Sequence, residues 1–455
     1  VAVTVSGNNN NALFMISGAD YITFDGLNTG GSSLSVTNTN ALSTASVFWI
    51  ASSGSDAASN NSILNCTISG SGTNTAFGCI TTGSSVSLGT SASAANSNNT
   101  ISGCTLYAAQ HGIFINGFTG TNDQNWVISN NIIGSINVPE KIGVRGITMQ
   151  GVNNFTVSGN TVSGIAMNAA ATAIGIYIFG NATNGNITKN SISDIRQSNI
   201  GGGSCGIYLA SGINTSFVNV TNNFIYDIYA IGSAVIANNA CGIVVSSGGG
   251  YSILYNSVSI TAGSGASNSI TSAIRISATV TFPGALDIRN NIFSNTTALG
   301  TRYSIYNGSV AGIFANINYN DYFSGTSTVL GYQEGNRANF PAWQSATGSD
   351  LKSLSIDPLF IAATNLHLQP VSPLNALGIA VPGLATDIDG DARLAIPDIG
   401  ADEFDATDCT GTPTGGTITA SSLALCYSGT ASIAATGFST GDGLSYQWEY
   451  SINGF

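Results

Sequence analysis

Four aspartates in one short segment have the spacing of a cation-binding loop. Asp387, Asp389 and Asp391 alternate along the chain, and Asp398 lies eleven residues after the first. Carboxylate oxygens at such spacing suit Ca²⁺, but the glycine stands at position 4 rather than 6 and the last residue is Asp rather than Glu. Two interpretations stay open: a calcium site, or a structural turn in which Arg393 pairs with one carboxylate.

A second candidate site is a stripe of aromatic residues that follows a repeated strand pattern. The pattern reads small, apolar, any, apolar, as in Gly175-Ile-Tyr-Ile178 and Gly206-Ile-Tyr-Leu209. Because strand side chains alternate, the two apolar residues point inward and the one between them points outward. The predicted outward stripe is Met15, Trp49, Ile80, Phe114, Thr148, Tyr177, Tyr208, Val244, Arg275 and Tyr306, with Phe179 in the next outward column.

Aromatic rings in this stripe offer apolar faces on which sugars can stack. The alternative is that long loops between the strands cover the stripe. If the stripe is open, the residues expected to contact a glycan or a partner protein are Trp49, Phe114, Tyr177, Phe179, Tyr208, Arg275 and Tyr306.

The same face lacks the residues that cleavage of a polysaccharide requires. Acid–base catalysis on sugars uses paired carboxylates, but the stripe and its neighbouring outward column contain no Asp or Glu. No catalytic residue is therefore assigned. Asp123, Glu140, Lys141 and Arg145 are the only notable charged group near the strand face, and an enzyme site would have to lie there.

Cysteine and histidine form no recognisable nucleophile or zinc motif. Cys66 and Cys104 occupy equivalent repeat positions, as do Cys205 and Cys241. Stacked neighbours lie within disulfide range, but parallel Cβ vectors place their sulfurs poorly, so free buried thiols are favoured over disulfides. Both histidines stand alone in sequence and are interpreted as structural: His111 and His367.

A six-residue motif with asparagine at its fourth position must organise these candidates in space. It reads apolar, any, any, Asn, any, apolar, and recurs nine times, with cysteine at the Asn position in the two earliest copies, at Cys66 and Cys104. From Cys66 to Asn320 is 254 residues in eight steps, a mean period of about 32. Such a period indicates a repeat architecture. Asparagine tolerates left-handed turns and carries both donors and acceptors. We expect one inward column of Asn131, Asn160, Asn190, Asn223, Asn256, Asn291 and Asn320.

An asparagine ladder joined to short strands resembles the right-handed parallel β-helix proteins of the pectate-lyase-like group. The resemblance covers about residues 1–405 and implies an all-β solenoid of ten or more coils, each with three short strands. Because the repeat fades after about residue 325, we expect repeats over 1–325 and an irregular last coil and C-terminal cap over 326–407. The phrase Pro397-Asp-Ile-Gly-Ala-Asp-Glu-Phe404 resembles the terminal segment of many secreted bacterial β-helix proteins.

Residues 408–455 are expected to form a linker and a truncated immunoglobulin-like β-sandwich. The spacing of Cys426 and Trp448 and the alternation around them carry this expectation. A β-helix followed by such a domain resembles the giant modular adhesins of Bacteroidota-type bacteria. The resemblance implies an extracellular, cell-surface location and further domains beyond both ends.

The composition of the chain limits the kinds of molecule that it is expected to bind. The net charge is −12 and only three residues are lysine, which argues against nucleic acid and anionic membranes. No apolar run of about 20 residues exists that would span a membrane. Partners are expected to be glycans or other cell-surface proteins, with no cofactor other than a possible calcium ion. We predict a non-enzymatic extracellular module, a rigid spacer with an adhesive or glycan-contacting role; the alternative is a polysaccharide lyase or glycoside hydrolase.

Overall fold

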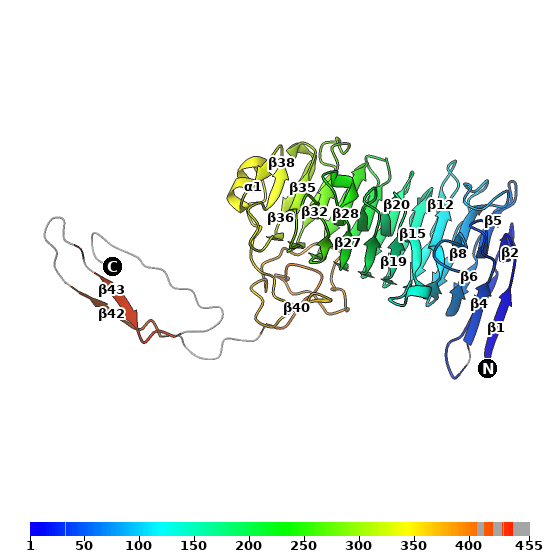
Figure 1. The fold of residues 1–455 in the computed structure, drawn as a ribbon, viewed down its shortest axis with the longest axis horizontal. Helices are drawn as coiled ribbons and strands as arrows, with labels where there is room; N and C mark the ends of the chain where they lie inside the picture. The colour runs from blue at the N-terminus through cyan, green and yellow to red at the C-terminus, as the bar shows by residue number, and fades with distance from the viewer. Residues whose placement is uncertain (32, 407–413, 422–429, 431, 440–455) are drawn as a thin grey trace.

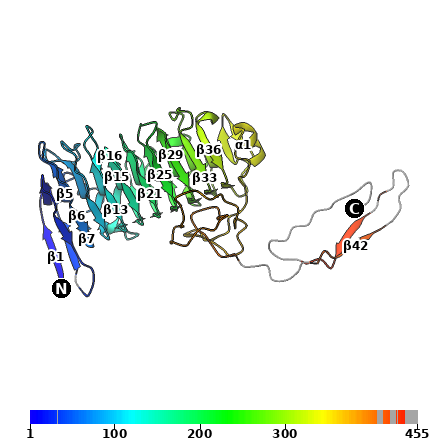
Figure 2. The same ribbon diagram turned by 180° about the vertical axis from the view of Figure 1, so that it is seen from behind.

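The chain folds into a parallel β-solenoid of about ten turns (Figure 1). The computed structural model describes residues 1–31, 33–406, 414–421, 430 and 432–439. Each coil adds one strand to each of three long parallel sheets, named A, B and C here, whose stacking is seen from the other side in Figure 2. The predicted all-β solenoid is thereby confirmed.

Sheet C holds the first strand of each coil and sheet A the second. The strands of sheet C are β3 (Thr23–Asp25), β6 (Ser62–Leu64), β9 (Thr100–Ser102), β13 (Val127–Ser129), β17 (Thr156–Ser158), β21 (Asn186–Thr188), β25 (Val218–Thr221), β29 (Tyr251–Leu254), β33 (Leu286–Arg289) and β36 (Phe314–Asn318). The strands of sheet A are β1 (Ala2–Gly7), β4 (Ser33–Asn38), β7 (Cys66–Ser69), β10 (Thr105–Tyr107), β14 (Ile132–Ile133), β18 (Thr161–Val162), β22 (Ser191–Ile192), β26 (Phe224–Tyr226), β30 (Ser257–Ile260), β34 (Ile292–Asn295) and β37 (Asp321–Phe323).

Sheet B holds the longer third strands, and it carries the Gly-apolar pattern. Its main path is β2 (Ala12–Ser17), β5 (Ser46–Ser52), β8 (Gly78–Ser84), β11 (Ala109–Asn116), β15 (Ile142–Gln150), β20 (Ala173–Phe179), β24 (Ser204–Ala210), β28 (Ala240–Ser247), β32 (Ile270–Ile276), β35 (Thr301–Asn307), β38 (Gly331–Gln333) and the antiparallel β39 (Asn336–Arg337). A branch of four short strands starts at β15, with which the first of them pairs. In order of pairing they are β19 (Ile165–Met167), β23 (Ile195–Gln197), β27 (Ile228–Ala230) and β31 (Gly263–Ser264).

The remaining elements are short. They are the parallel pair β12 (Asp123–Gln124) and β16 (Val152–Asn153), the antiparallel pairs β40 (Phe360–Ala362) with β41 (Asn365–Leu368) and β42 (Thr417–Ala420) with β43 (Ile433–Thr436), the helix α1 (Phe340–Thr347), and the 3-10 turns η1 (Val138–Glu140), η2 (Ile236–Asn238) and η3 (Ala311–Ile313). No helix within the described ranges is long and apolar enough to cross a membrane.

The predicted asparagine column lies at the corner between sheets C and A and is buried. Asn190 illustrates the geometry: its backbone N–H and its Nδ2 both donate to Oδ1 of Asn223 in the next coil, each at 3.0 Å. Its Nδ2 also donates to the carbonyl of Val157 in the preceding coil, at 2.9 Å. The same pattern runs from Asn131 to Asn320 without a break.

Both ends of this ladder are completed by other groups. At the first end, the backbone N–H of Cys104 donates to Oδ1 of Asn131 at 2.9 Å. At the other end, the backbone N–H of Asn320 donates to the hydroxyl of Ser353 at 2.8 Å. Since a buried unpaired backbone group destabilises a fold, the ladder provides partners for the corner backbone in each coil from Asn131 to Asn320.

One reason given for asparagine at this position is corrected by the backbone. The residue in the left-handed region is the one before each ladder asparagine, with φ of 57° at Lys189, 53° at Asn222 and 53° at Tyr255. No ladder asparagine has a positive φ. The position therefore selects asparagine for its amide group and not for its tolerance of a left-handed backbone.

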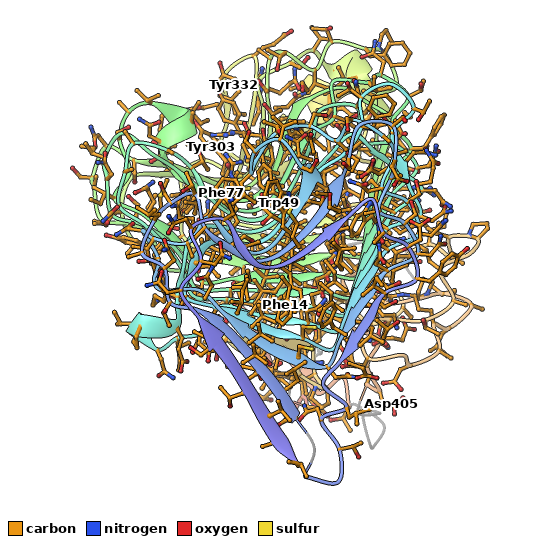
Figure 3. All side chains as sticks on the ribbon, turned by 90° about the vertical axis from the view of Figure 1, so that its right-hand side faces the viewer. Phe14, Trp49, Phe77, Tyr303, Tyr332 and Asp405 are labelled. Carbon is orange, nitrogen blue, oxygen red and sulfur yellow. The ribbon has the colours of Figure 1, made fainter. Side chains whose placement is uncertain are left out.

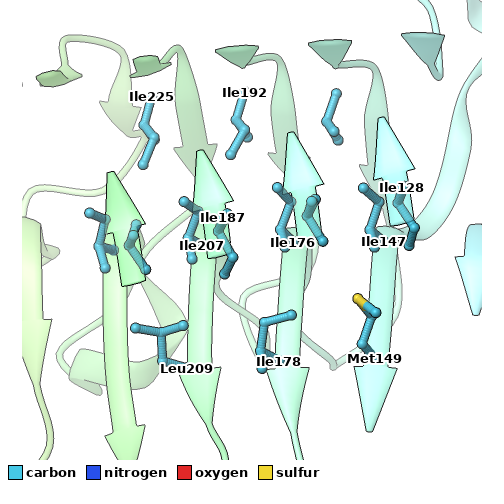
Figure 4. Close-up of a cluster of buried hydrophobic side chains, with 14 of the residues drawn as sticks. Ile128, Ile147, Met149, Ile176, Ile178, Ile187, Ile192, Ile207, Leu209 and Ile225 are labelled. Carbon is cyan, nitrogen blue, oxygen red and sulfur yellow. The ribbon is translucent and has the colours of Figure 1, made fainter. Parts of the chain in front are cut away.

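The inward columns build a continuous apolar core. Figure 4 shows stacked columns of isoleucine from all three sheets, with Ile147, Ile176 and Ile207 from sheet B. These three side chains are fully buried. Viewed along the axis, the sheets enclose an interior that contains Phe14 (Figure 3). Since stacked aliphatic rows are stabilised by the area they remove from water, each coil depends on its two neighbours.

The small residue of the sheet B pattern is required by contact across the core. A Cβ added to Gly175 would lie 2.6 Å from Cγ2 of Ile192 and 2.7 Å from the carbonyl of Gly206. Gly146, Gly206 and Gly242 meet the same obstacle from Val or Ile of sheet A. The two sheets thus approach each other too closely at this position for a larger side chain.

The predicted cap segment has two parts with different roles. Helix α1 lies at the end of the solenoid (Figure 1), where Trp343 is buried and packs against Tyr322 of the last sheet A strand. The later residues, from about 354 to 404, turn back and pack along the side of the coils, where Leu368, Leu374 and Ile399 cover Ile292. The proposed immunoglobulin-like domain lies largely outside the described residues, including Cys409, Cys426 and Trp448.

Replacing a central ladder residue should weaken the fold. Asn190→Leu leaves the N–H of Asn160 and the carbonyl of Val157 without their partners. We expect a loss of about 1–3 kcal/mol in the free energy of unfolding, measured by chemical denaturation. Asn168→Leu, at an exposed loop position, is the control and should change it by less than about 0.5 kcal/mol. Equal stability of the two variants would contradict a structural role for the ladder.

Filling the core-facing glycine position should also destabilise the rod. Gly175→Ala forces a methyl group against Ile192 and the backbone of Gly206, so we expect a cost of about 1–3 kcal/mol by thermal or chemical unfolding. Gly312→Ala has open space around the added methyl and should be near neutral. A neutral Gly175→Ala variant would show that the sheets can separate at this point without cost.

Candidate functional site

The outward stripe of sheet B runs along the length of the rod in strict register. Trp49 pairs with Thr81, and Thr81 with Phe114. The predicted position of Ile80 in the stripe is therefore wrong. Ile80 pairs with Phe48 and Ile113 on the neighbouring strands, and its side chain is fully buried. The error arose because Gly78 was aligned with the small residue of the pattern. In the structure Gly78 pairs with His111, which stands one position before the small residue of β11. The observed stripe is Met15, Trp49, Thr81, Phe114, Thr148, Tyr177, Tyr208, Val244, Arg275, Tyr306 and Tyr332.

Loops cover part of this stripe. Trp49 is only 3% exposed and packs with Leu88 from the loop after β8. A hollow of about 600 Å³ remains there, lined by Met15, Phe77 and Val86 among others. Trp49 and Phe77 are labelled in Figure 3. Trp49, proposed as a contact residue, therefore presents almost none of its surface to a ligand.

The middle of the stripe holds a half-buried aromatic group. The rings of Tyr177 and Phe179 stack with centroids 4.4 Å apart and an angle of 3°. Tyr208, on the next strand, meets Tyr177 edge-on at 5.2 Å. Sequence reasoning expected these three residues to share a face, and the structure places them in direct contact.

Arg145 completes this group, although the stripe pattern did not include it. It lies three residues before the stripe position of β15, and its guanidinium sits 4.6 Å above the ring of Tyr177. In the described parts of the chain no carboxylate forms an ion pair with it, and its buried Nε has no hydrogen-bond partner. Burial lowers the pKa of Arg145 from its ordinary value. We name Arg145, Tyr177, Phe179 and Tyr208 the central cluster.

His111 lies beside Arg145 in the register and is an interior residue. Its ring is 5.1 Å from both Phe77 and Phe114, and its Nδ1 is buried without a partner. Burial, together with the charge of Arg145, lowers the pKa of His111 to about 3. A neutral imidazole is therefore packed among rings, which matches its interpretation as structural.

A second aromatic group lies near the end of the stripe. Tyr306 stacks on Tyr332 at 4.4 Å and 13°, and Tyr303 lies edge-on to both. Tyr332 was missed because the repeat pattern had already faded at that point in the sequence. Arg275, on the preceding strand, donates to the carbonyl of Ile236 at 2.7 Å, so part of its hydrogen-bonding capacity is already used.

The charged group considered for an enzyme site is dispersed. Asp123 is buried, accepts from two backbone amides, and has its pKa raised to about 7 by burial. Lys141 pairs with Asp194 at 2.8 Å on the side of β23. Glu140 accepts from Asn137. No ion pair joins any two members of the group across the described residues.

Two of the four aspartates proposed to bind calcium accept backbone hydrogen bonds from nearby segments of the cap. Asp387 accepts the backbone N–H groups of Asp389, Gly390 and Asp391 through Oδ1 and of Glu403 through Oδ2, all at 2.8–3.0 Å. Both oxygens of Asp398 likewise accept backbone N–H groups, those of Ala376 and Phe404. Binding of Ca²⁺ by the four stays a prediction.

Arg393 does not pair with any of the four aspartates. It pairs with Glu403 at 3.1 Å and lies 3.9 Å above the ring of Tyr255, which belongs to the solenoid. The expected pairing with one of the four aspartates is therefore wrong. The guanidinium is directed at the solenoid instead, where it also donates to Oδ1 of Asn222 at 2.9 Å, while the oxygens of Asp387 and Asp398 accept backbone N–H groups.

All five cysteines that the structure describes are free and buried: Cys66, Cys79, Cys104, Cys205 and Cys241. Cys205 and Cys241 are stacked on neighbouring strands under Tyr208 and Val244, and their thiols donate to backbone carbonyls of Ile207 and Ile243. The preference for free thiols over disulfides is confirmed for these residues.

No protein-family model and no curated protein sequence matches this chain.

The buried histidine should make the fold sensitive to acid. Folded His111 stays neutral to about pH 3, whereas the unfolded residue takes a proton near pH 6.5. Below that pH the unfolded state binds more protons, so stability falls as pH falls. Between pH 7 and pH 5 the natural chain should lose about 2 kcal/mol more than His111→Phe, whose ring fits between Phe77 and Phe114.

Comparing the two proteins removes the contribution of shared groups such as Asp123, whose raised pKa acts in the opposite direction. The measurement is chemical denaturation at several pH values. Parallel stability curves for the two proteins would show that His111 is protonated in the folded state.

Proposed function

We propose that this protein is a non-catalytic, glycan-contacting rod of a bacterial surface protein, and that the central cluster is its contact site. The observation that carries the proposal is the unpaired guanidinium of Arg145 beside the rings of Tyr177, Phe179 and Tyr208. Among the arginines of the described residues, the other six donate hydrogen bonds to a carboxylate or a backbone carbonyl, whereas the guanidinium of Arg145 has no such partner. It favours a ligand that brings its own negative charge.

The chemistry of the cluster suits an acidic sugar. A guanidinium presents paired N–H donors that match a carboxylate or sulfate group. Rings on neighbouring strands offer apolar faces for the carbon skeleton of the sugar. Arg145, Tyr177 and Tyr208 belong to three consecutive strands, which span roughly 10 Å along the rod at ordinary strand spacing. A short segment of a polysaccharide can contact all three at once.

The net charge of the chain modifies this interaction. At −12 the protein as a whole repels a polyanion, but the repulsion from distant charges is screened over about 8 Å at physiological ionic strength. Short-range contact at Arg145 is less affected because the guanidinium is partly buried. We therefore expect modest affinity per site, with avidity when many copies of the rod meet one polymer.

The architecture supports a role as a spacer. The ladder and the stacked aliphatic rows make each coil depend on its neighbours, so the rod resists bending at any single coil. An extracellular location and attachment to a larger surface protein belong to the same proposal, on the basis of the sequence resemblance described above. Interaction with other surface proteins along the stripe is compatible with it.

The second candidate is a polysaccharide lyase or hydrolase. Its support is limited to the presence of Lys141 and Arg145 on neighbouring parts of β15 and the loop before it. Lys141 is held in an ion pair with Asp194, and the carboxylates nearby have other partners. An enzyme would have to recruit groups that the structure shows engaged elsewhere, and for this reason we favour binding without cleavage.

Binding should depend on the central cluster. We expect the chain to bind an acidic polysaccharide such as polygalacturonate more tightly than a neutral galactan, measured by affinity electrophoresis and calorimetry. Arg145→Gln should weaken binding of the acidic polymer about 10- to 100-fold, the range for a charged hydrogen bond, and leave the weaker neutral interaction unchanged. Tyr177→Ala should weaken both. Tyr21→Ala, at an exposed tyrosine off the stripe, is the matched control.

Three outcomes would change the proposal. No binding to either polymer would rule out these glycans as ligands. Binding unaffected by Arg145→Gln and Tyr177→Ala would move the contact to another surface. Release of unsaturated or reducing-end products, abolished by Lys141→Ala or Arg145→Ala, would replace the non-catalytic assignment with a lyase or hydrolase.

A further inference from the structure

The folded-back part of the cap brings together three side chains from separate segments. His367 lies on β41, Asp389 in the turn of residues 387–391, and Asp402 near the end of the cap. Nε2 of His367 is 2.8 Å from Oδ2 of Asp389. One ligand atom from each of the three lies within 4.8 Å of the others, and this is the only such His, Cys, Asp and Glu group within the part of the chain that the structure describes.

We propose that His367, Asp389 and Asp402 bind a divalent transition-metal ion of the zinc class. An imidazole nitrogen with two carboxylates is a ligand set that Zn²⁺ accepts, at about 2.0–2.2 Å from each atom, whereas Ca²⁺ takes oxygen ligands. Asp389 is half exposed and can rotate to bring its oxygen to the metal. Three protein ligands leave a fourth position for water.

Hydrogen bonds around the imidazole prepare Nε2 as the ligand atom. Oδ1 of Asn365 accepts the backbone N–H of His367 at 3.2 Å and also faces Nδ1 of the ring. An amide oxygen only accepts, so Nδ1 carries the proton and a neutral ring has its lone pair on Nε2, directed at Asp389. Two acceptors at 2.8 Å repel unless a cation lies between them or the ring takes a second proton.

The other groups of the site are also oriented. The carboxylate of Asp402 is buried and accepts the backbone N–H of Leu368 at 2.7 Å. The ring of Phe224, on β26 of the solenoid, lies edge-on to His367 at 4.9 Å. Outer contacts of this kind fix the direction of metal ligands in proteins.

This site differs from the calcium quartet predicted from sequence. It shares only Asp389 with that group, because both oxygens of Asp387 and of Asp398 accept backbone N–H groups. A bound ion would join β41, the 387–391 turn and the end of the cap, next to the solenoid strand that carries Phe224. Its effect would be to hold the cap against the coils.

The test uses the full chain without a histidine tag, freed of metal by a chelator. Titration with ZnCl₂ should show one equivalent bound by calorimetry and a melting temperature raised by several degrees. CoCl₂ should give visible absorption bands of a nitrogen- and oxygen-ligated ion. His367→Gln and Asp402→Asn should each weaken zinc binding at least tenfold, while Asp391→Asn, an exposed carboxylate of the same turn, should bind like the natural chain.

Asp402→Asn keeps an oxygen for the N–H of Leu368, so a loss of binding there with an unchanged circular dichroism spectrum separates ligation from folding. Absence of zinc binding by the natural chain would overturn the proposal, leaving a protonated histidine paired with Asp389. Equal zinc binding by His367→Gln would also overturn it. A melting temperature raised by CaCl₂ and not by ZnCl₂ would overturn it in favour of an oxygen-only site.

Discussion

The bond from each asparagine to the next is the interaction on which the solenoid depends. A coil must turn sharply between sheets C and A, and the turn leaves a backbone amide and a carbonyl facing the interior. The buried amide side chain satisfies both, and its oxygen receives two donors from the coil before it. Because unpaired buried groups cost more than paired ones gain, the corner tolerates few other residues. From Asn131 to Asn320, this repeated corner holds successive coils in register.

With the corner and the core-facing glycine fixed, the outward face is free to vary. Phe, Thr, Tyr, Val and Arg occupy equivalent stripe positions in successive coils without disturbing the aliphatic rows beneath them. The central cluster uses this freedom: Arg145 lies over Tyr177 on a neighbouring strand, so two coils contribute to one site. A contact surface built in this way can lengthen along the rod, one residue per coil.

Features that repeat could be predicted from sequence, whereas those that occur once could not. The asparagine column and inward isoleucines were found because their spacing persists over many coils. Ile80 was misplaced because β8 carries its glycine one position before the usual place, and only the register with β11 reveals the shift. The covering of Trp49 depends on a loop whose length carries no conformational signal. His367 and Asp402 are 35 residues apart without a motif, and only the fold-back of the cap joins them.

The left-handed corner residues explain how the cap is attached. Asn222, Tyr255 and Asn290 each precede a ladder asparagine in consecutive coils, and each bonds to the cap: Asn222 to Thr386, and the other two to Ile379. A repeat protein with nearest-neighbour contacts alone can open at any interface between coils. Here one segment bridges three coils, so opening between any two of them requires the bridge to detach first. Under a stretching force along the axis, this part of the rod would yield as one block, and extension would begin in the coils that the cap does not span.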